Sequence, residues 1–178
     1  MRRSPVRIAS RFQFSAGPDR TPVTGFSLPS VAVPATLLQT NGGKREGEIF
    51  VMERVSQHAG AETPLDLLNR PEAFFPFRST KDGSGVLLIA KARTVMLSVS
   101  RTGPEDSDRL SAAKQASLEV TLADGSKLSG WATLELPQHH SRLLDYLNAS
   151  RDAFFALATA DQTHIVNRAH VLYVRPED

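Results

Sequence analysis

The alternation of apolar and polar residues near position 120 predicts a β-hairpin. Residues 117–122 alternate between the two kinds, as a strand does when one of its faces is buried. Asp124 and Gly125 follow, and this dipeptide is favoured in tight hairpin turns. Apolar residues continue beyond the turn, so a second strand is expected over residues 127–136.

A short helix and three further strands are expected between this hairpin and the end of the chain. Three leucines after Ser141 have the spacing of one helix face, which predicts a helix over residues 142–148. Three short apolar segments come next. We expect them to form strands that begin at Phe154, at Thr163 and at His170.

The same order of elements occurs earlier in the chain, which indicates an internal duplication. The interval between matched segments changes only from 82 to 77 residues, so the two copies differ by short loop insertions. In the first copy, Thr63 and Pro64 have the residue types of a helix start. The matched segments are 53–58 with 135–140, 65–69 with 144–148, 73–77 with 153–157, and 89–95 with 166–172.

The sequence therefore predicts a mainly β fold with short helices. We expect two tandem, small, barrel-like units related by an approximate two-fold axis, and an irregular N-terminal arm. The expected boundaries are 1–30 for the arm, 31–99 for the first unit, 100–115 for a linker and 116–178 for the second unit.

Charge separates the N-terminal segment from the rest of the chain. Residues 1–45 carry a net charge of +6, and the remaining residues carry −4. Nucleic-acid-binding domains usually concentrate basic groups on the folded body, so this distribution argues against a nucleic-acid partner. A composition of 40% hydrophobic and 22% charged residues excludes wholesale disorder, and the lack of cysteine excludes thiol chemistry.

The N-terminal arm combines prolines, arginines and isolated phenylalanines. Prolines exclude a regular helix, whereas the apolar residues are more numerous than a solvated tail normally has. The arm therefore packs either along its own body or along another protein. For the second case, the residues expected to dock the partner are Arg2, Arg3, Arg7, Arg11, Phe12 and Phe14.

No pattern of residues predicts catalysis, a cofactor or a metal ion. His139 and His140 are neighbours, and neighbouring residues of an extended chain point to opposite faces, so they are poorly placed to share a metal. His58 matches His140 in the repeat, which favours a structural role for both. The matched phenylalanines are expected in the core rather than on a surface that stacks bases; they are Phe74, Phe75, Phe77, Phe154 and Phe155.

The second unit resembles the Sm-like fold, a small five-stranded barrel found in RNA-associated proteins. The resemblance lies in residues 120–125 with 127–130, and in residues 166–171 near the end of the chain. It implies a strand–turn–strand opening and a final turn that lines an RNA site. Carried over to both units, the residues implied to contact RNA are Lys91, Arg93, Arg168 and His170.

The leading hypothesis is a non-enzymatic structural or adaptor subunit, since duplicated barrels offer paired surfaces and edges for assembly. Its partners would be other protein subunits of a larger complex. The protein would be cytoplasmic, with the arm suited to an anionic membrane surface at the inner face of a membrane. The alternatives are an Sm-like RNA-binding module and a small-ligand sensor, because Arg3 and Arg7 have the arginine spacing of PilZ-type domains.

Overall fold

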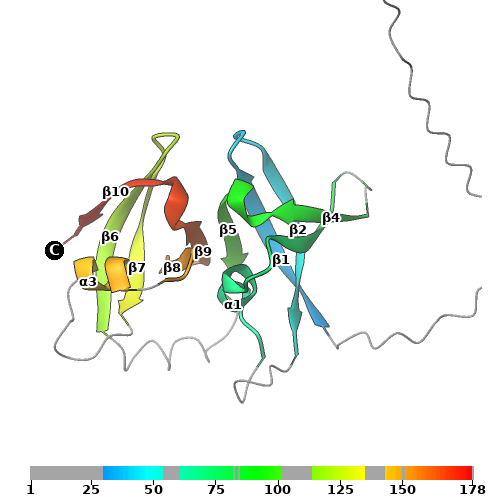
Figure 1. Cartoon of the computed structure of the whole chain (residues 1–178), viewed down its shortest axis with the longest axis horizontal. Helices are drawn as coiled ribbons and strands as arrows, with labels where there is room; N and C mark the ends of the chain where they lie inside the picture. Colours follow the sequence, from blue (N-terminus) through cyan, green and yellow to red (C-terminus); the bar gives the residue numbers. More distant parts are fainter. Residues whose placement is uncertain are drawn as a thin grey trace, which may run out of the picture.

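The computed structural model describes residues 30–53, 61–81, 83, 85–101, 114–134, 143–149 and 151–177. These residues form two lobes that lie side by side, with five consecutive strands in each (Figure 1). The first lobe contains β1 (Ser30–Gln39), β2 (Lys44–Met52), α1 (Pro64–Asn69), β3 (Phe74–Ser79), β4 (Val86–Ala90), the 3₁₀ turn η1 (Lys91–Arg93) and β5 (Thr94–Ser100). The second contains β6 (Lys114–Leu122), β7 (Lys127–Leu134), α3 (Leu143–Ala149), β8 (Phe154–Ala158), β9 (Gln162–Asn167), the 3₁₀ turn η3 (Arg168–His170) and β10 (Val171–Pro176).

The ten strands of the described residues form one antiparallel sheet that runs through both lobes. Its order is β10-β6-β7-β8-β9-β5-β1-β2-β3-β4, so each lobe places its last strand beside its first. The prediction of a mainly β fold with two tandem, barrel-like units is confirmed. Most of the predicted arm and linker lie outside the described residues, which begin at Ser30 and omit 102–113.

The two lobes repeat each other in strand register as well as in strand order. Phe75 lies opposite Ile89 between β3 and β4, and the matched Phe155 lies opposite Val166 between β8 and β9. The pairing of β1 with β5 shifts register at its end near Leu38, and the pairing of β6 with β10 shifts at the matched place. The duplication seen in the sequence therefore extends to individual residue pairs.

A glycine in the second strand of each lobe allows the neighbouring strand to approach closely. A Cβ atom at Gly47 would clash with the carbonyl oxygen of Arg78, and one at Gly130 would clash with that of Ala158. These carbonyls belong to matched residues of β3 and β8. Glycine is the residue that permits such close backbone contact, and the second strand of each lobe has one at this point.

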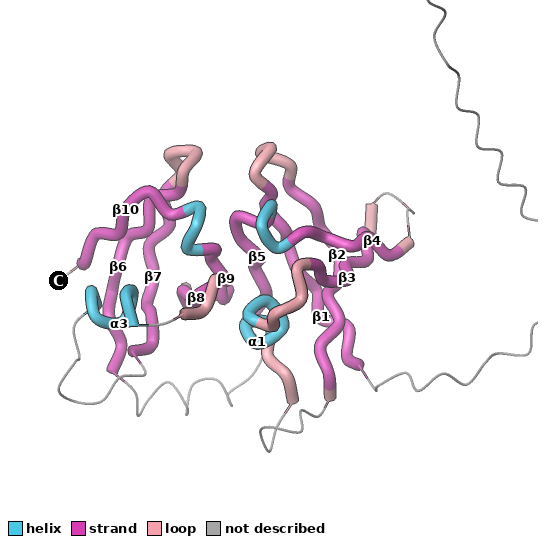
Figure 2. The backbone as a smooth tube through the Cα atoms, viewed as in Figure 1, coloured by secondary structure: helices cyan, strands magenta, loops and turns pink. Residues whose placement is uncertain are grey.

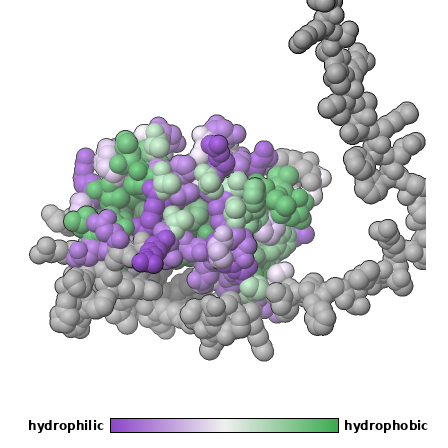
Figure 3. All heavy atoms as spheres, in the orientation of Figure 1, coloured by the Kyte–Doolittle hydropathy of each residue, from purple (hydrophilic) through white to green (hydrophobic). Residues whose placement is uncertain are grey.

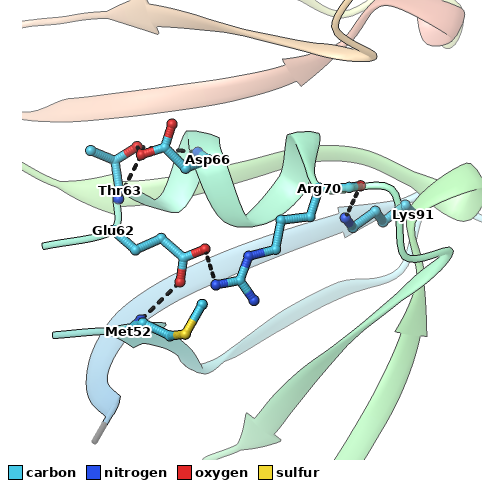
Figure 4. Close-up of polar contacts among 6 residues, drawn as sticks. All are labelled: Met52, Glu62, Thr63, Asp66, Arg70 and Lys91. Atoms are coloured by element: carbon cyan, nitrogen blue, oxygen red, sulfur yellow. Dashed lines mark hydrogen bonds and ion pairs between the residues drawn. The ribbon is translucent and has the colours of Figure 1, made fainter. Parts of the chain in front are cut away.

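The helix α1 begins at the predicted place. The Thr63 side chain accepts a hydrogen bond from the Asp66 backbone N–H, and the Asp66 carboxylate accepts one from the Thr63 backbone N–H (Figure 4). This reciprocal pair is a capping box, and Pro64 occupies the first helical position. Leu67 and Leu68 are the buried residues of this helix. Ser141, the expected start of the second helix, lies outside the described residues.

The lobes are joined head to tail. At the junction β5, the last strand of the first lobe, pairs with β9, which matches β4 and not β5. A two-fold axis exchanges the two lobes. It would therefore either pair equivalent strands with each other at the junction, or pair β4 with β10 in addition to β5 with β9. Strands β4 and β10 instead lie at opposite ends of the sheet. The approximate two-fold relation expected from the sequence is thus replaced by a head-to-tail one.

Candidate functional site

The junction between the lobes is an interface between two folded units of the same chain. Strands β5 and β9 pair from Met96 opposite Val166 to Ser100 opposite Gln162. Phe154 of β8 and Ile165 of β9 are buried in the core of the first lobe. In the other direction, Val95 of β5 is buried in the core of the second lobe. Each lobe therefore completes the core of its neighbour.

A side-chain amide of α1 holds the second lobe at this junction. The Asn69 side chain donates from Nδ2 to the Phe154 carbonyl oxygen at 3.1 Å, and its Oδ1 accepts from the Phe154 backbone N–H at 2.9 Å. In the sequence, Asn69 stands out only as the last residue of the matched segment 65–69. Its recurrence as Asn148 was the signal that this residue has a further role.

The two 3₁₀ turns lie beside each other at one end of the junction (Figure 2). A ring nitrogen of His170, Nε2, shares a hydrogen bond of 3.1 Å with the carbonyl oxygen of Ala92. Asn167 donates from its side chain to the carbonyl oxygens of Lys91 at 3.3 Å and Thr94 at 2.9 Å. All three bonds cross from η3 or β9 to η1 or β5, so the turns contribute to the junction.

The four residues implied to contact RNA all lie in these turns, and three of them, including His170, have internal partners. Buried Lys91 donates its ammonium to the Arg70 carbonyl oxygen at 2.7 Å, and burial lowers its pKa. Arg168 donates to the Leu147 carbonyl oxygen at 3.0 Å and stacks over the Phe155 ring. The exposed cation of the set is Arg93. The turns therefore offer RNA less positive charge than the sequence suggests.

Glu62 forms a buried polar cluster at the base of the loop before α1 (Figure 4). Its carboxylate accepts from the Met52 backbone N–H at 2.8 Å and pairs with the Arg70 guanidinium at 2.5 Å. The Arg70 carbonyl in turn accepts from Lys91. Every charge in this cluster has a partner within the first lobe, so the cluster fixes the position of α1.

A polar hollow of about 220 Å³ lies beside the β1–β2 turn. Lys81 pairs with Glu46 at 3.0 Å, and Arg45 donates to the Gln39 side chain at 3.3 Å. The Glu46 carboxylate offsets the charge of Lys81, whereas Gln39 is neutral and offsets none of the charge of Arg45. The described residues contain no group of three histidine, aspartate or glutamate side chains that could hold a metal ion.

Ser98 and His164 form a buried polar pair within the junction. The Ser98 hydroxyl oxygen and His164 Nδ1 share a hydrogen bond of 2.8 Å. Burial lowers the pKa of His164 below the ordinary histidine value because the charged form loses its hydration. The neutral imidazole is therefore the form that fits the folded junction.

We expect the folded chain to lose stability as pH falls through the range in which free histidine is protonated. The unfolded chain takes up a proton on His164 at higher pH than the folded chain does, so acid favours unfolding. One proton changes the free energy of unfolding by at most about 1.4 kcal/mol per pH unit. Urea titrations between about pH 7.5 and pH 5 measure the slope.

His164→Gln is expected to reduce this pH dependence, since glutamine can bond Ser98 but does not titrate. His170→Gln is the matched control, because His170 is only partly buried and its ring bonds a carbonyl at the edge of the junction. An equal loss of slope in both variants would contradict the assignment to His164.

Large exposed apolar side chains gather towards the two outer ends of the sheet, with polar residues between them (Figure 3). At the first end they lie on β3 and β4, and at the second on α3 and β10. Two others, Val31 and Trp131, lie elsewhere. The residues at the ends are Phe74, Val86, Leu88, Leu144, Leu172 and Tyr173.

Phe74 corrects one expectation from the sequence. It was expected in the core with its matched partner Phe154, yet it is exposed whereas Phe154 is buried. The reason is that Phe154 projects into the neighbouring lobe, and no described part of the chain covers the same position on the first lobe. The other four matched phenylalanines are buried, as expected; they are Phe75, Phe77, Phe154 and Phe155.

Several expectations fall outside the described residues. They concern the histidines His58, His139 and His140, and the proposed docking residues Arg2, Arg3, Arg7, Arg11, Phe12 and Phe14. Within the described ranges, none of the helices has the length and apolar character needed to cross a bilayer. The fold and junction define the class of molecule as a tandem repeat of five-stranded antiparallel β units.

No protein-family model matches the chain, and no curated protein or solved structure shows significant similarity to it.

Proposed function

We propose that the protein is a non-enzymatic structural subunit that docks onto a larger protein assembly. The observation that carries this proposal is the pair of open sheet ends, each lined by large exposed apolar side chains. Strands β4 and β10 have a neighbour on one side only among the described residues. Unpaired strands with apolar side chains favour association with another protein.

The N-terminal arm supplies the second docking element in this proposal. Its arginines suit carboxylates or phosphates, and Phe12 and Phe14 suit shallow apolar pockets. An acidic protein surface meets both requirements. The proposed location is the cytoplasm, where such an assembly at the inner face of a membrane would also offer anionic lipid headgroups to Arg2 and Arg3.

The alternative of an Sm-like RNA-binding module has less support. Three of its four implied contacts already share hydrogen bonds with carbonyl oxygens of the protein; they are Lys91, Arg168 and His170. The PilZ-like alternative depends on Arg3 and Arg7, which both lie outside the described residues. We therefore favour the structural subunit.

A chain truncated to begin at residue 30 is expected to keep its fold and lose its partner. Strand β1 starts at Ser30, so the truncation removes no described element. The melting temperature should stay within about 3 °C of the full chain, which corresponds to roughly 1 kcal/mol for a protein of this size. The native assembly should be retained by the full chain and not by the truncated one, as measured by mild affinity purification.

The control is a full chain in which Arg2, Arg3, Arg7 and Arg11 are replaced by lysine, which keeps charge but not the planar bidentate contacts. Retention of the assembly by the truncated chain would contradict docking through the arm. A large fall in its melting temperature would show instead that the arm packs on its own body. A nuclease-sensitive RNA as the sole retained partner would favour the RNA-binding alternative.

A further inference from the structure

The internal junction and the two open ends of the sheet involve matched positions of the repeat. Residue pairing aligns β4 with β9 and β5 with β10, with the same partners on the neighbouring strands. The junction joins β9 to β5, so among the described strands those left open at the ends are their counterparts β4 and β10. One open end of the sheet is thus equivalent to the β9 side of the internal junction, and the other open end is equivalent to the β5 side.

On the first lobe, the open end exposes the counterparts of residues that the junction buries. Phe154 is 2% exposed, whereas the matched Phe74 is 57% exposed. Ile165 is 1% exposed, whereas the matched Leu88 is 72% exposed. Phe154 and Ile165 are the two residues that enter the neighbouring core. The first lobe therefore presents the same apolar pair, and no core among the described residues receives it.

On the second lobe, the open end exposes the counterparts of the receiving residues. Val95 is 8% exposed because the other lobe covers it, whereas the matched Leu172 is 64% exposed. Tyr173 matches Met96, which packs against the second core. Helix α3 shows the same difference. Leu144 of α3 is exposed, whereas the matched Leu65 of α1 packs against the first core.

Polar groups of the junction are duplicated as well. Asn69 holds the backbone of Phe154 with two hydrogen bonds. Its counterpart Asn148 lies exposed near the end of α3, on the lobe that carries β10. If a β3 strand lay against α3 in the way that β8 lies against α1, the backbone of Phe74 would face the amide of Asn148. The open ends match in apolar and in polar groups.

We propose that the open end of the first lobe binds the open end of the second lobe in another copy of this chain. Strand β4 of one molecule would pair antiparallel with β10 of the next and so repeat the internal β9–β5 junction. This inference deepens the proposed structural role and rests on it. A head-to-tail contact leaves one open end on each side of a dimer, so the assembly grows until it closes or stays open.

The internal register fixes the register between copies. Ser98 lies opposite His164 in the junction, and the matched residues are Arg175 and Leu87. The backbone N–H of Glu177 bonds Ser117 of β6, so by alternation the N–H of residue 176 points to the open side. That residue is Pro176, which has no N–H to donate. The contact between copies is therefore expected to be shorter and weaker than the internal one.

Sedimentation velocity of the full chain tests the proposal. The average mass is expected to rise above that of the monomer as concentration increases from about 1 to about 500 µM. Leu88→Glu on the first lobe and Leu172→Glu on the second should each weaken self-association by at least roughly 30-fold, the worth of one buried leucine. Trp131→Glu is the matched control, since Trp131 is exposed but lies on neither end. Equal melting temperatures verify folding.

Mixing the two variants distinguishes a head-to-tail contact from a symmetric one. Each variant keeps one intact end, and the intact ends are complementary, so an equimolar mixture should form dimers and no larger species. Monomers alone in the mixture, or a monomeric full chain throughout the concentration range, would overturn the proposal. Equal loss of association in the Trp131→Glu control would also overturn it.

Engineered cysteines test the register. The chain has no cysteine of its own, so a disulfide can form only between introduced residues. Oxidation of a mixture of Leu87→Cys and Arg175→Cys chains should yield the mixed dimer. The positive control is Ser98→Cys with His164→Cys in one chain, which occupies the matched internal positions. Val86→Cys with Arg175→Cys is one residue out of register, and more efficient crosslinking of that pair would overturn the predicted register.

The outcomes separate this inference from the proposed function. A chain that is monomeric alone but held in a larger assembly through residues 1–29 overturns the second-copy contact and leaves the structural role intact. A chain that self-associates as described but retains no other protein overturns docking onto a larger assembly, and the contact between copies stands.

Discussion

Phe154→Ala is expected to lower the free energy of unfolding by about 3–5 kcal/mol, the usual range for a fully buried phenylalanine. The side chain lies within the core of the opposite lobe, so its removal leaves a cavity there. It also loosens the strand segment that Asn69 holds by two hydrogen bonds. For a chain of this length the melting temperature should fall by roughly 6–20 °C. Calorimetry at low protein concentration measures both quantities.

Phe74→Ala is the matched control for this substitution. It removes the same side chain from the same repeat position, but Phe74 is exposed. The expected change is within about 0.5 kcal/mol, as for most surface substitutions. Similar decreases in the free energy of unfolding for the two variants would contradict the assignment of Phe154, and not Phe74, to the buried junction.

Leu68→Ala is expected to destabilise the chain by about 2–5 kcal/mol, because Leu68 is fully buried between α1 and the first core. The repeat alone would predict the same loss for the matched Leu147→Ala. Leu147 is only partly buried, however, so roughly 1–2 kcal/mol is expected there. Helix α1 is covered by β8 of the other lobe, and no described residues cover α3 in that way.

Urea titration of both variants gives the comparison, with Leu144→Ala as a control at an exposed position of α3. Two neutral results at Leu68 and Leu147 would mean that neither helix packs on its lobe. Equally large losses of stability in Leu68→Ala and Leu147→Ala would mean that α3 is covered in solution. The contact between copies would cover α3 in this way at high protein concentration. Titrations at several protein concentrations distinguish these two cases.

The strands of the second unit were predictable from the sequence because local patterns determine them. Alternation over 117–122 and the Asp124–Gly125 turn have direct counterparts in β6 and in the turn to β7. The capping residues Thr63 and Pro64 likewise placed the start of α1 correctly. The repeat then carried these local predictions to the other half of the chain. A mainly β fold with two units followed from them.

The arrangement of the units could not be predicted from local patterns. Phe74 and Phe154 are the same residue in the same sequence setting, and only a neighbour on one side makes one of them buried. The role of Asn69 has the same origin, since its partner Phe154 is 85 residues away in the chain. The positive charge of Lys91 and Arg168 appeared available for RNA because the carbonyl oxygens that bind them are not visible in a sequence.

The exchange of side chains between the two cores has a consequence for how the protein unfolds. In many repeat proteins each unit has its own stability, and the contact between units adds to it. Here the first core includes Phe154 and Ile165 of the second unit, and the second core includes Val95 of the first. Neither unit retains a complete interior once the other has opened. We therefore expect the duplicated halves to unfold as a single cooperative domain, with one melting transition in place of two.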